Sequence, residues 1–151
     1  MTTPIPFEST TPRFGLPLLF VGQAQKEAFV NEAHVIADAI MHCAVAGESF
    51  APPASPLDGE CWLVAANSSG DWAGHTGKIA CHHAGNWLFV TPRNGMRILN
   101  LATGQDRRYH GSWLTAEAPP APTGGTTVDT EARSTIAGLL SALRTAGVLP
   151  A

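Results

Sequence analysis

Histidine, cysteine and aspartate side chains gather in the middle of the sequence, and they are the residues best suited to chemistry. The set comprises Asp71, His75, Cys81, His82, His83 and His110. A zinc ion needs three or four such ligands converging at short range. Successive residues of a strand face opposite sides, so Cys81, His82 and His83 cannot all reach one ion, although Cys81 and His83 could share a face opposite His110. We therefore expect no metal and no cofactor.

A cysteine nucleophile paired with a histidine is the other chemistry that these residues could perform. Cys81 with His110, or Cys61 with His75, would supply the pair. The flanking residues do not resemble a cysteine-hydrolase signature, and no residue stands out to orient the histidine. Carboxylates for glycoside hydrolysis are few and scattered, and no glycine-rich phosphate motif is present. We therefore expect no catalytic residues and no enzyme activity.

The composition excludes further classes of function. The 151 residues carry a formal net charge of −3, without the basic footprint of a nucleic-acid-binding protein. No apolar run is long enough to span a bilayer, and no basic region of a signal peptide begins the sequence. Three widely spaced cysteines fit synthesis in a reducing cytosol better than a disulfide framework. Charged residues make up only 14% of the chain, which predicts a surface partly covered by neighbouring subunits.

A long amphipathic helix is the element that we expect to organise the fold. From residue 23 to residue 46, apolar side chains, Phe29 among them, recur mostly at intervals of three or four, which is one face of a helix. Asp38 is among the polar residues of the opposite face. Residues 1–11, rich in threonine and proline, are predicted to form an arm that packs only against a neighbouring subunit. Phe7 and Phe14 are the candidate docking residues of this arm.

From residue 59 to residue 115 the pattern changes to that of short strands. We predict a buried strand over 61–65, then a hairpin of strands 78–82 and 87–90, then a second hairpin over 96–110. The fold class is therefore predicted as α+β. In this fold, the long N-terminal helix packs on a small antiparallel β-sheet of hairpins, within one domain over residues 12–115.

The four tryptophans are the aromatic candidates for binding. Trp62 and Trp87 lie in apolar strand segments, so we expect them in the core. Trp72 and Trp113 follow polar residues beside turns. For these two, the core and a surface role remain open, the surface role being a contact with a subunit or with a sugar.

The C-terminal part is predicted as a tethered amphipathic helix. Residues 116–127 read as a flexible linker rich in proline, glycine and threonine, and residues 128–151 as an oligomerisation or docking helix. Asp129 is the expected N-cap and Gly147 the expected stop. The apolar stripe has coiled-coil spacing over about two heptads. It could be internal core or a seam between copies, and the linker favours the seam; its candidate residues are Ile136, Leu139, Leu140 and Leu143.

Several short motifs occur in the order found in a known family. They begin with residues 11–17 and 22–27 and continue through 51–56, 59–62, 72–74, 77–80, 85–87 and 92–96. Over roughly residues 11–115 the chain resembles an uncharacterised domain family in phage and gene-transfer-agent virion proteins of alphaproteobacteria. Members of that family occur in long tail fibres and in head spikes at capsid vertices, and the resemblance supplies no catalytic residues.

The resemblance implies a structural virion protein. Because the chain lacks the large distal region of a fibre, we expect a head-spike base or fibre adaptor at a capsid vertex that holds a host-receptor-binding fibre. Its implied partners are further copies of itself in a homo-oligomer, the major capsid protein and a spike or fibre protein. It would be made in the bacterial cytoplasm and then lie on the particle exterior. A tail-fibre component, or a module that binds host capsular polysaccharide, is the alternative.

Overall fold

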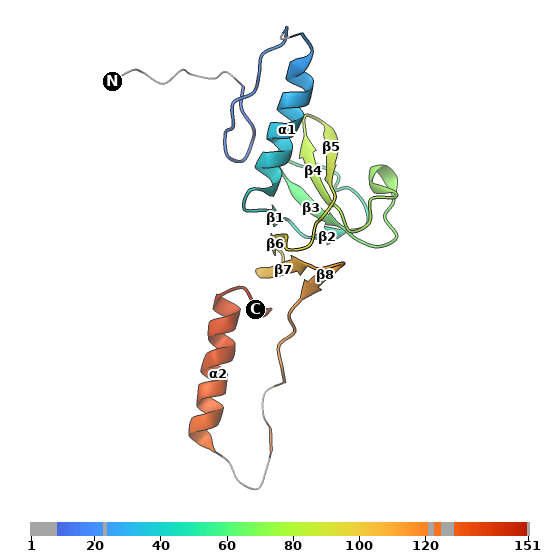
Figure 1. The fold of residues 1–151 in the computed structure, drawn as a ribbon. Coiled ribbons are helices and arrows are strands. Elements are labelled where there is room, and N and C mark those ends of the chain that lie inside the picture. The colour runs from blue at the N-terminus through green and yellow to red at the C-terminus, as the bar shows by residue number, and fades with distance from the viewer. Residues whose placement is uncertain (1–8, 23, 121–122, 125–128, 151) are drawn as a thin grey trace, which may run out of the picture. The chain divides into compact units, whose positions relative to one another are not determined.

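The computed structural model describes residues 9–22, 24–120, 123–124 and 129–150 (Figure 1). The fold is α+β, as the sequence predicts. Contacts divide the chain into two compact units, Met1–Pro92 and Arg93–Ala151. The boundary between them falls inside the residues predicted as one domain. Within the described ranges, no helix combines the length and the apolar character needed to cross a bilayer.

The helix of the first unit starts later than predicted. Helix α1 begins at Lys26 and spans Lys26–Ile40. The two residues before it, Ala24 and Gln25, have positive φ angles of 57° and 65°. A right-handed helix excludes this left-handed backbone, so the helix-favouring composition around residue 24 does not extend the element.

The same helix also ends earlier than predicted. Met41 is extended, and His42 has a positive φ of 46°. The chain then forms the short strand β1, Ala44–Val45, in which Val45 is fully buried. The apolar residues that seemed to continue the helical pattern to residue 46 therefore belong to a buried strand segment.

A mixed sheet with the order β2–β3–β4–β5 lies at the centre of the first unit. Its strands are Glu48–Ser49, Cys61–Val64, Ile79–His83 and Asn86–Val90. The predicted strand at 61–65 and the first predicted hairpin are confirmed. Strand β2, however, runs parallel to β3, so the sheet is not purely antiparallel. The proline-rich stretch between these strands provides the long crossover that a parallel pair needs.

This sheet carries apolar side chains on both faces because successive strand residues alternate. Cys61 and Cys81 are register partners on one face, and helix α1 lies beside β4 (Figure 1). The other face is covered by Trp72 from the 3₁₀ turn η1, Gly70–Trp72. Val64, Trp72 and Ala80 form a buried cluster there, against which Trp62, Trp87 and Phe89 pack.

The second unit contains an antiparallel meander and the helix α2. The strands are β6, Arg97–Asn100, β7, Gln105–Tyr109, and β8, Trp113–Thr115. Helix α2 spans Thr130–Thr145. Its predicted N-cap is confirmed, since the Asp129 carboxylate accepts a hydrogen bond from the Ala132 N–H at 2.8 Å. Gly147, the predicted stop, has a left-handed φ of 70°.

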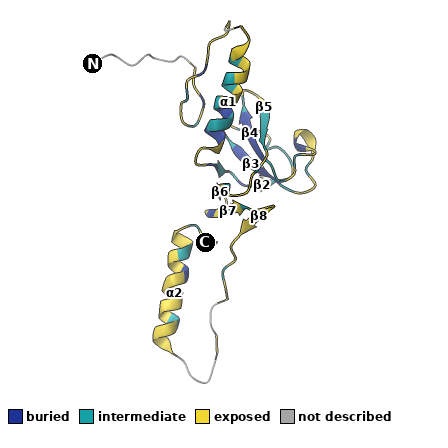
Figure 2. Cartoon of the chain, in the orientation of Figure 1, coloured by how far each residue is buried: buried dark blue, intermediate teal, exposed yellow. Residues whose placement is uncertain are grey.

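The chain just beyond α2 is anchored to the strands of its own unit. The Asp106 N–H donates to the Gly147 carbonyl at 2.7 Å, and the Gln105 side-chain amide donates to the Val148 carbonyl at 3.0 Å. Leu149 is buried. The linker suggested a helix held away from the β-strands. The C-terminal end of the helix instead returns to β7. Most of the remaining surface of α2 is exposed (Figure 2).

Candidate functional site

Arg13 and Asp38 join the segment that precedes α1 to the helix itself. The buried Asp38 carboxylate accepts hydrogen bonds from the N–H groups of Arg13 at 3.0 Å and Phe14 at 2.7 Å. The Arg13 guanidinium donates to the carbonyls of Asp38, Ala39 and His42 at 2.9, 2.7 and 3.1 Å. The last carbonyls of a helix lack helical partners and favour a nearby cation. Arg13 therefore caps the C-terminal end of α1.

The role of Asp38 was missed from the sequence, where it was assigned to the polar face of the helix. The structure instead buries it against the preceding segment. The available signal was that Asp38 lies between Val35 and Ala39, which are apolar residues of the same helical pattern. A carboxylate at such a position must be paired or hydrogen-bonded, because an unsatisfied buried charge is costly.

Further hydrogen bonds hold residues 9–19 along α1. The Thr11 N–H donates to the Leu16 carbonyl at 2.9 Å, which closes the loop. The Asn31 side chain bonds both backbone groups of Leu19, at 2.8 and 3.0 Å. Residues 9–11, which belong to the predicted arm, are thus part of a structured loop. Phe7 lies outside the described residues.

Large apolar side chains remain exposed where this loop meets the N-terminal end of α1. Val21 is 95% exposed, Phe29 79% and Phe20 51%, and we call these three the N-terminal apolar residues. Phe29 was assigned to the buried face of the predicted helix, and the structure contradicts this. Phe14, a predicted docking residue, is also exposed. Scattered exposed apolar residues are ordinary, but three such large side chains within ten positions are candidates for a contact surface.

The structure decides between the core and the surface role that the sequence left open for Trp72. Trp72 is fully buried, with its ring centroid 6.4 Å from that of Trp62 and 5.0 Å from that of Trp87. It therefore cannot touch a subunit or a sugar, and its assignment as a contact candidate is corrected. Turn η1 folds it back onto the sheet. Trp113 is half-buried and packs edge-to-face on Tyr109 at 5.2 Å.

The stripe on α2 divides into two sets. Leu140 is buried and Leu143 is half-buried, so these two contribute to packing within the chain. Ile136 and Leu139 are 43% and 58% exposed. Of the predicted seam, Ile136 and Leu139 are the residues that the fold leaves most available to another chain.

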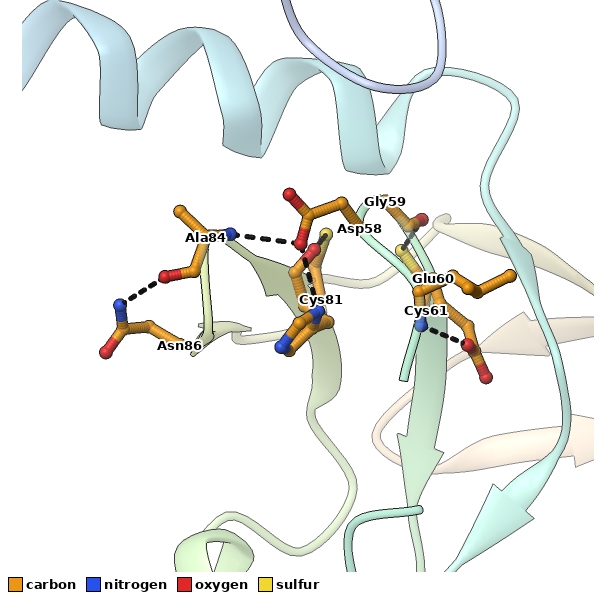
Figure 3. Close-up of polar contacts among 9 residues, drawn as sticks. Asp58, Gly59, Glu60, Cys61, Cys81, Ala84 and Asn86 are labelled. Atoms are coloured by element: carbon orange, nitrogen blue, oxygen red, sulfur yellow. Dashed lines mark hydrogen bonds and ion pairs between the residues drawn. The ribbon is translucent and has the colours of Figure 1, made fainter. Parts of the chain in front are cut away.

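Polar groups cluster at one end of β3 and β4 (Figure 3). His82 Nδ1 lies 3.1 Å from the Asp58 carboxylate, which also accepts the Ala84 N–H at 3.1 Å. His82 and Cys81 face opposite sides of the sheet. Among the described residues, no group of three or more histidine, cysteine, aspartate or glutamate side chains could hold a metal ion. The candidate site is the exposed set of N-terminal apolar residues, Phe20, Val21 and Phe29.

Comparison with known proteins agrees with the sequence resemblance in one respect, which is that the matching family is an uncharacterised domain family. The model of the family described as Protein of unknown function (DUF2793) matches residues 30–114. The matched segment contains most of α1 and all of β1 to β7. No curated protein matched the chain. The loop that carries Arg13 lies before the matched segment, whereas its partner Asp38 lies inside it.

Proposed function

The chain belongs to the family described as Protein of unknown function (DUF2793), and we propose that it is a structural protein of a phage or gene-transfer-agent particle. In this role it forms a head-spike base or fibre adaptor at a capsid vertex and holds a host-receptor-binding fibre. It assembles with copies of itself, with the major capsid protein and with a spike or fibre protein. It is made in the bacterial cytoplasm and then lies on the particle exterior.

The observation that carries this proposal is the exposure of the N-terminal apolar residues, Phe20, Val21 and Phe29. Fully burying an exposed side chain of this kind contributes about 1.5–3 kcal/mol. The loop that bears Phe20 and Val21 is held to α1 by the Leu19–Asn31 hydrogen bonds. A rigid surface loses little conformational entropy on binding, so these residues are suited to a permanent subunit contact.

Helix α2 supplies a second surface of the same kind. A 16-residue helix is marginal in water by itself and depends on packing for its stability. Leu140 packs within the chain, whereas Ile136 and Leu139 remain largely exposed. A second copy of the helix, or the next protein of the assembly, would cover this side.

Size-exclusion chromatography with light scattering tests the contact surface directly. The wild-type chain should run as an oligomer at micromolar concentration. The double variant Val21→Ser/Phe29→Ser should shift the mass toward the monomer. Leu57→Ser is the matched control, because Leu57 is 73% exposed but lies outside the N-terminal apolar residues. A wild-type chain that stays monomeric throughout would contradict the proposal.

Electron microscopy of particles tests the location. A tagged wild-type chain, produced in cells that make phage or gene-transfer-agent particles, should appear at capsid vertices. The Val21→Ser/Phe29→Ser variant should be depleted from purified particles while Leu57→Ser is retained. Label found along the tail would instead support the tail-fibre alternative.

A further inference from the structure

Two buried thiols lie directly opposite each other in the central sheet of the first unit. Cys61 of β3 and Cys81 of β4 are register partners, and each is 2% exposed. Figure 3 shows both side chains on the side of these strands that faces α1. All three cysteines of the chain, including Cys43, are free thiols in this structure.

The hydrogen bonds around this pair determine how closely the two residues approach. At the flanking positions, the His82 N–H donates to the Glu60 carbonyl at 2.9 Å and the Val64 N–H donates to the Lys78 carbonyl at 3.0 Å. The Cys61 carbonyl instead accepts the Ala46 N–H at 2.8 Å, on the edge of β3 away from β4.

Because hydrogen-bonded and non-hydrogen-bonded pairs alternate along an antiparallel ladder, Cys61 and Cys81 form a non-hydrogen-bonded pair. Such pairs have Cα atoms about 4.5 Å apart with the side chains close together. This separation lies within the range of about 4.4–6.8 Å that a disulfide spans.

The two thiols also differ in acidity. A hydrogen bond with Cys61 lowers the pKa of the Cys81 thiol, and the Arg13 guanidinium adds to this effect. The same hydrogen bond, together with burial, raises the pKa of Cys61. Burial raises the pKa of Cys43 to about 11. The thiolate is the reactive form of cysteine, so Cys81 is the more nucleophilic sulfur of the pair.

We propose that Cys61 and Cys81 are a covalent modification site that closes into a cross-strand disulfide when the protein meets a peroxide. The Cys81 thiolate attacks one peroxide oxygen, which gives a sulfenic acid, and the displaced hydroxide is protonated to water. The Cys61 sulfur then attacks the Cys81 sulfur, the S–S bond forms, and the sulfenic oxygen leaves as a second water. Two thiols and one hydrogen peroxide thus give one disulfide and two waters.

The bond would close a loop that contains η1 and Trp72. Cross-linking a loop of this length restricts the unfolded chain, so the oxidised protein should melt about 5–10 °C higher than the reduced protein. This site does not depend on the proposed particle role. It would nevertheless give a chain folded in a reducing cytosol a covalent brace after release into an oxidising environment.

The test uses the purified full-length chain, reduced and then treated with hydrogen peroxide. Free thiols are alkylated under denaturing conditions, and the intact mass and the non-reduced peptide map are recorded. We expect the loss of two hydrogen atoms, one cross-linked peptide joining residues 61 and 81, and alkylation at Cys43. Cys43→Ser should leave the disulfide yield unchanged, whereas Cys61→Ser should stop at a sulfenic acid on residue 81 that dimedone traps.

Several results would overturn the proposal. These are a disulfide that includes Cys43, an intermolecular disulfide as the main product, or recovery of three alkylated cysteines after prolonged treatment. Should Cys61→Ser fail to fold, the wild-type peptide map and the melting temperature decide the question without it. An oxidised chain that melts at the same temperature as the reduced chain would exclude the bracing role.

Discussion

Asp38 accepts the backbone N–H of Arg13 at 3.0 Å, while the Arg13 guanidinium donates to the backbone carbonyl of Asp38 at 2.9 Å. Each side chain therefore satisfies the backbone of the other. Arg13 lies before the segment matched by the family model, and Asp38 lies inside it. The loop before α1 is consequently part of the folded unit, and it carries Phe20 and Val21, two of the three residues to which we assign assembly.

Replacing Asp38 by alanine should release this loop. The variant loses two hydrogen bonds to a buried carboxylate, so the free energy of unfolding should fall by about 3 kcal/mol. Urea denaturation followed by circular dichroism measures the change. Glu32→Ala, on an exposed position of the same helix, should change stability by less than about 0.5 kcal/mol. Equal effects of the two substitutions would show that the Asp38 contacts contribute little.

A second prediction concerns Gly59, against which Pro12 packs. Gly59 has a φ of 82°, and a Cβ added there would lie 2.9 Å from the Pro12 Cγ. Gly74 has a similar φ of 78° with no atom within 4 Å of its added Cβ. Gly74→Ala should therefore cost only the backbone strain, about 1–2 kcal/mol, and Gly59→Ala about 1–3 kcal/mol more.

Thermal unfolding of the two glycine variants separates these contributions. Limited proteolysis should also cut the loop before α1 faster in Gly59→Ala than in Gly74→Ala, because the added methyl displaces Pro12. If the two variants melt together and are cut at the same rate, the packing of Pro12 on Gly59 is not important for stability.

Features that depend on local chemistry were predicted from the sequence. Asp129 caps α2 through a hydrogen bond made three residues away, and Gly147 ends it through its own left-handed backbone. The hairpin of β4 and β5 turns through Ala84 and Gly85, both with positive φ. Each of these signals lies within a few residues of the structure that it specifies, so one sequence is sufficient to find it.

Features that depend on distant residues were not predicted. No local signal separates α1 from β1, because Val45 is apolar in either element and its burial depends on residues that are distant in the sequence. The burial of Trp72 likewise depends on Trp62 and Trp87, whose rings pack against it on the same face of the sheet. Asp38 lies among apolar helix residues, but its partner Arg13 is 25 residues away in the sequence, so the helical pattern alone did not identify the contact. Tertiary packing overrode the local pattern at each of these positions.

The burial of Trp72 leads to a third prediction. Trp72→Ala removes the largest fully buried side chain of the first unit, so the free energy of unfolding should fall by about 3–5 kcal/mol. Trp113→Ala, at a half-buried position, should cost clearly less. Guanidinium denaturation of both variants provides the comparison. A larger cost at Trp113 than at Trp72 would contradict the assignment of Trp72 to the core.

The last prediction concerns two like charges that face each other in the second unit. Arg97 of β6 and Arg108 of β7 are register partners, and both are exposed. Like charges directly opposite in a sheet destabilise it by about 0.2–1 kcal/mol. Arg97→Gln and Arg108→Gln each remove the repulsion while keeping a long polar side chain. Each single variant should therefore be more stable than the wild type at low salt.

A double-mutant cycle isolates this repulsion from every other effect of the two substitutions. The double variant should gain less than the sum of the single gains, because the first substitution has already removed the repulsion. The coupling should shrink in high salt, since exposed charges are screened over about 3 Å at 1 M ionic strength. A coupling that is absent, or that does not change with salt, would mean that the two guanidinium groups point apart in solution. Arg93→Gln, outside the paired strands, controls for the loss of one positive charge from this unit.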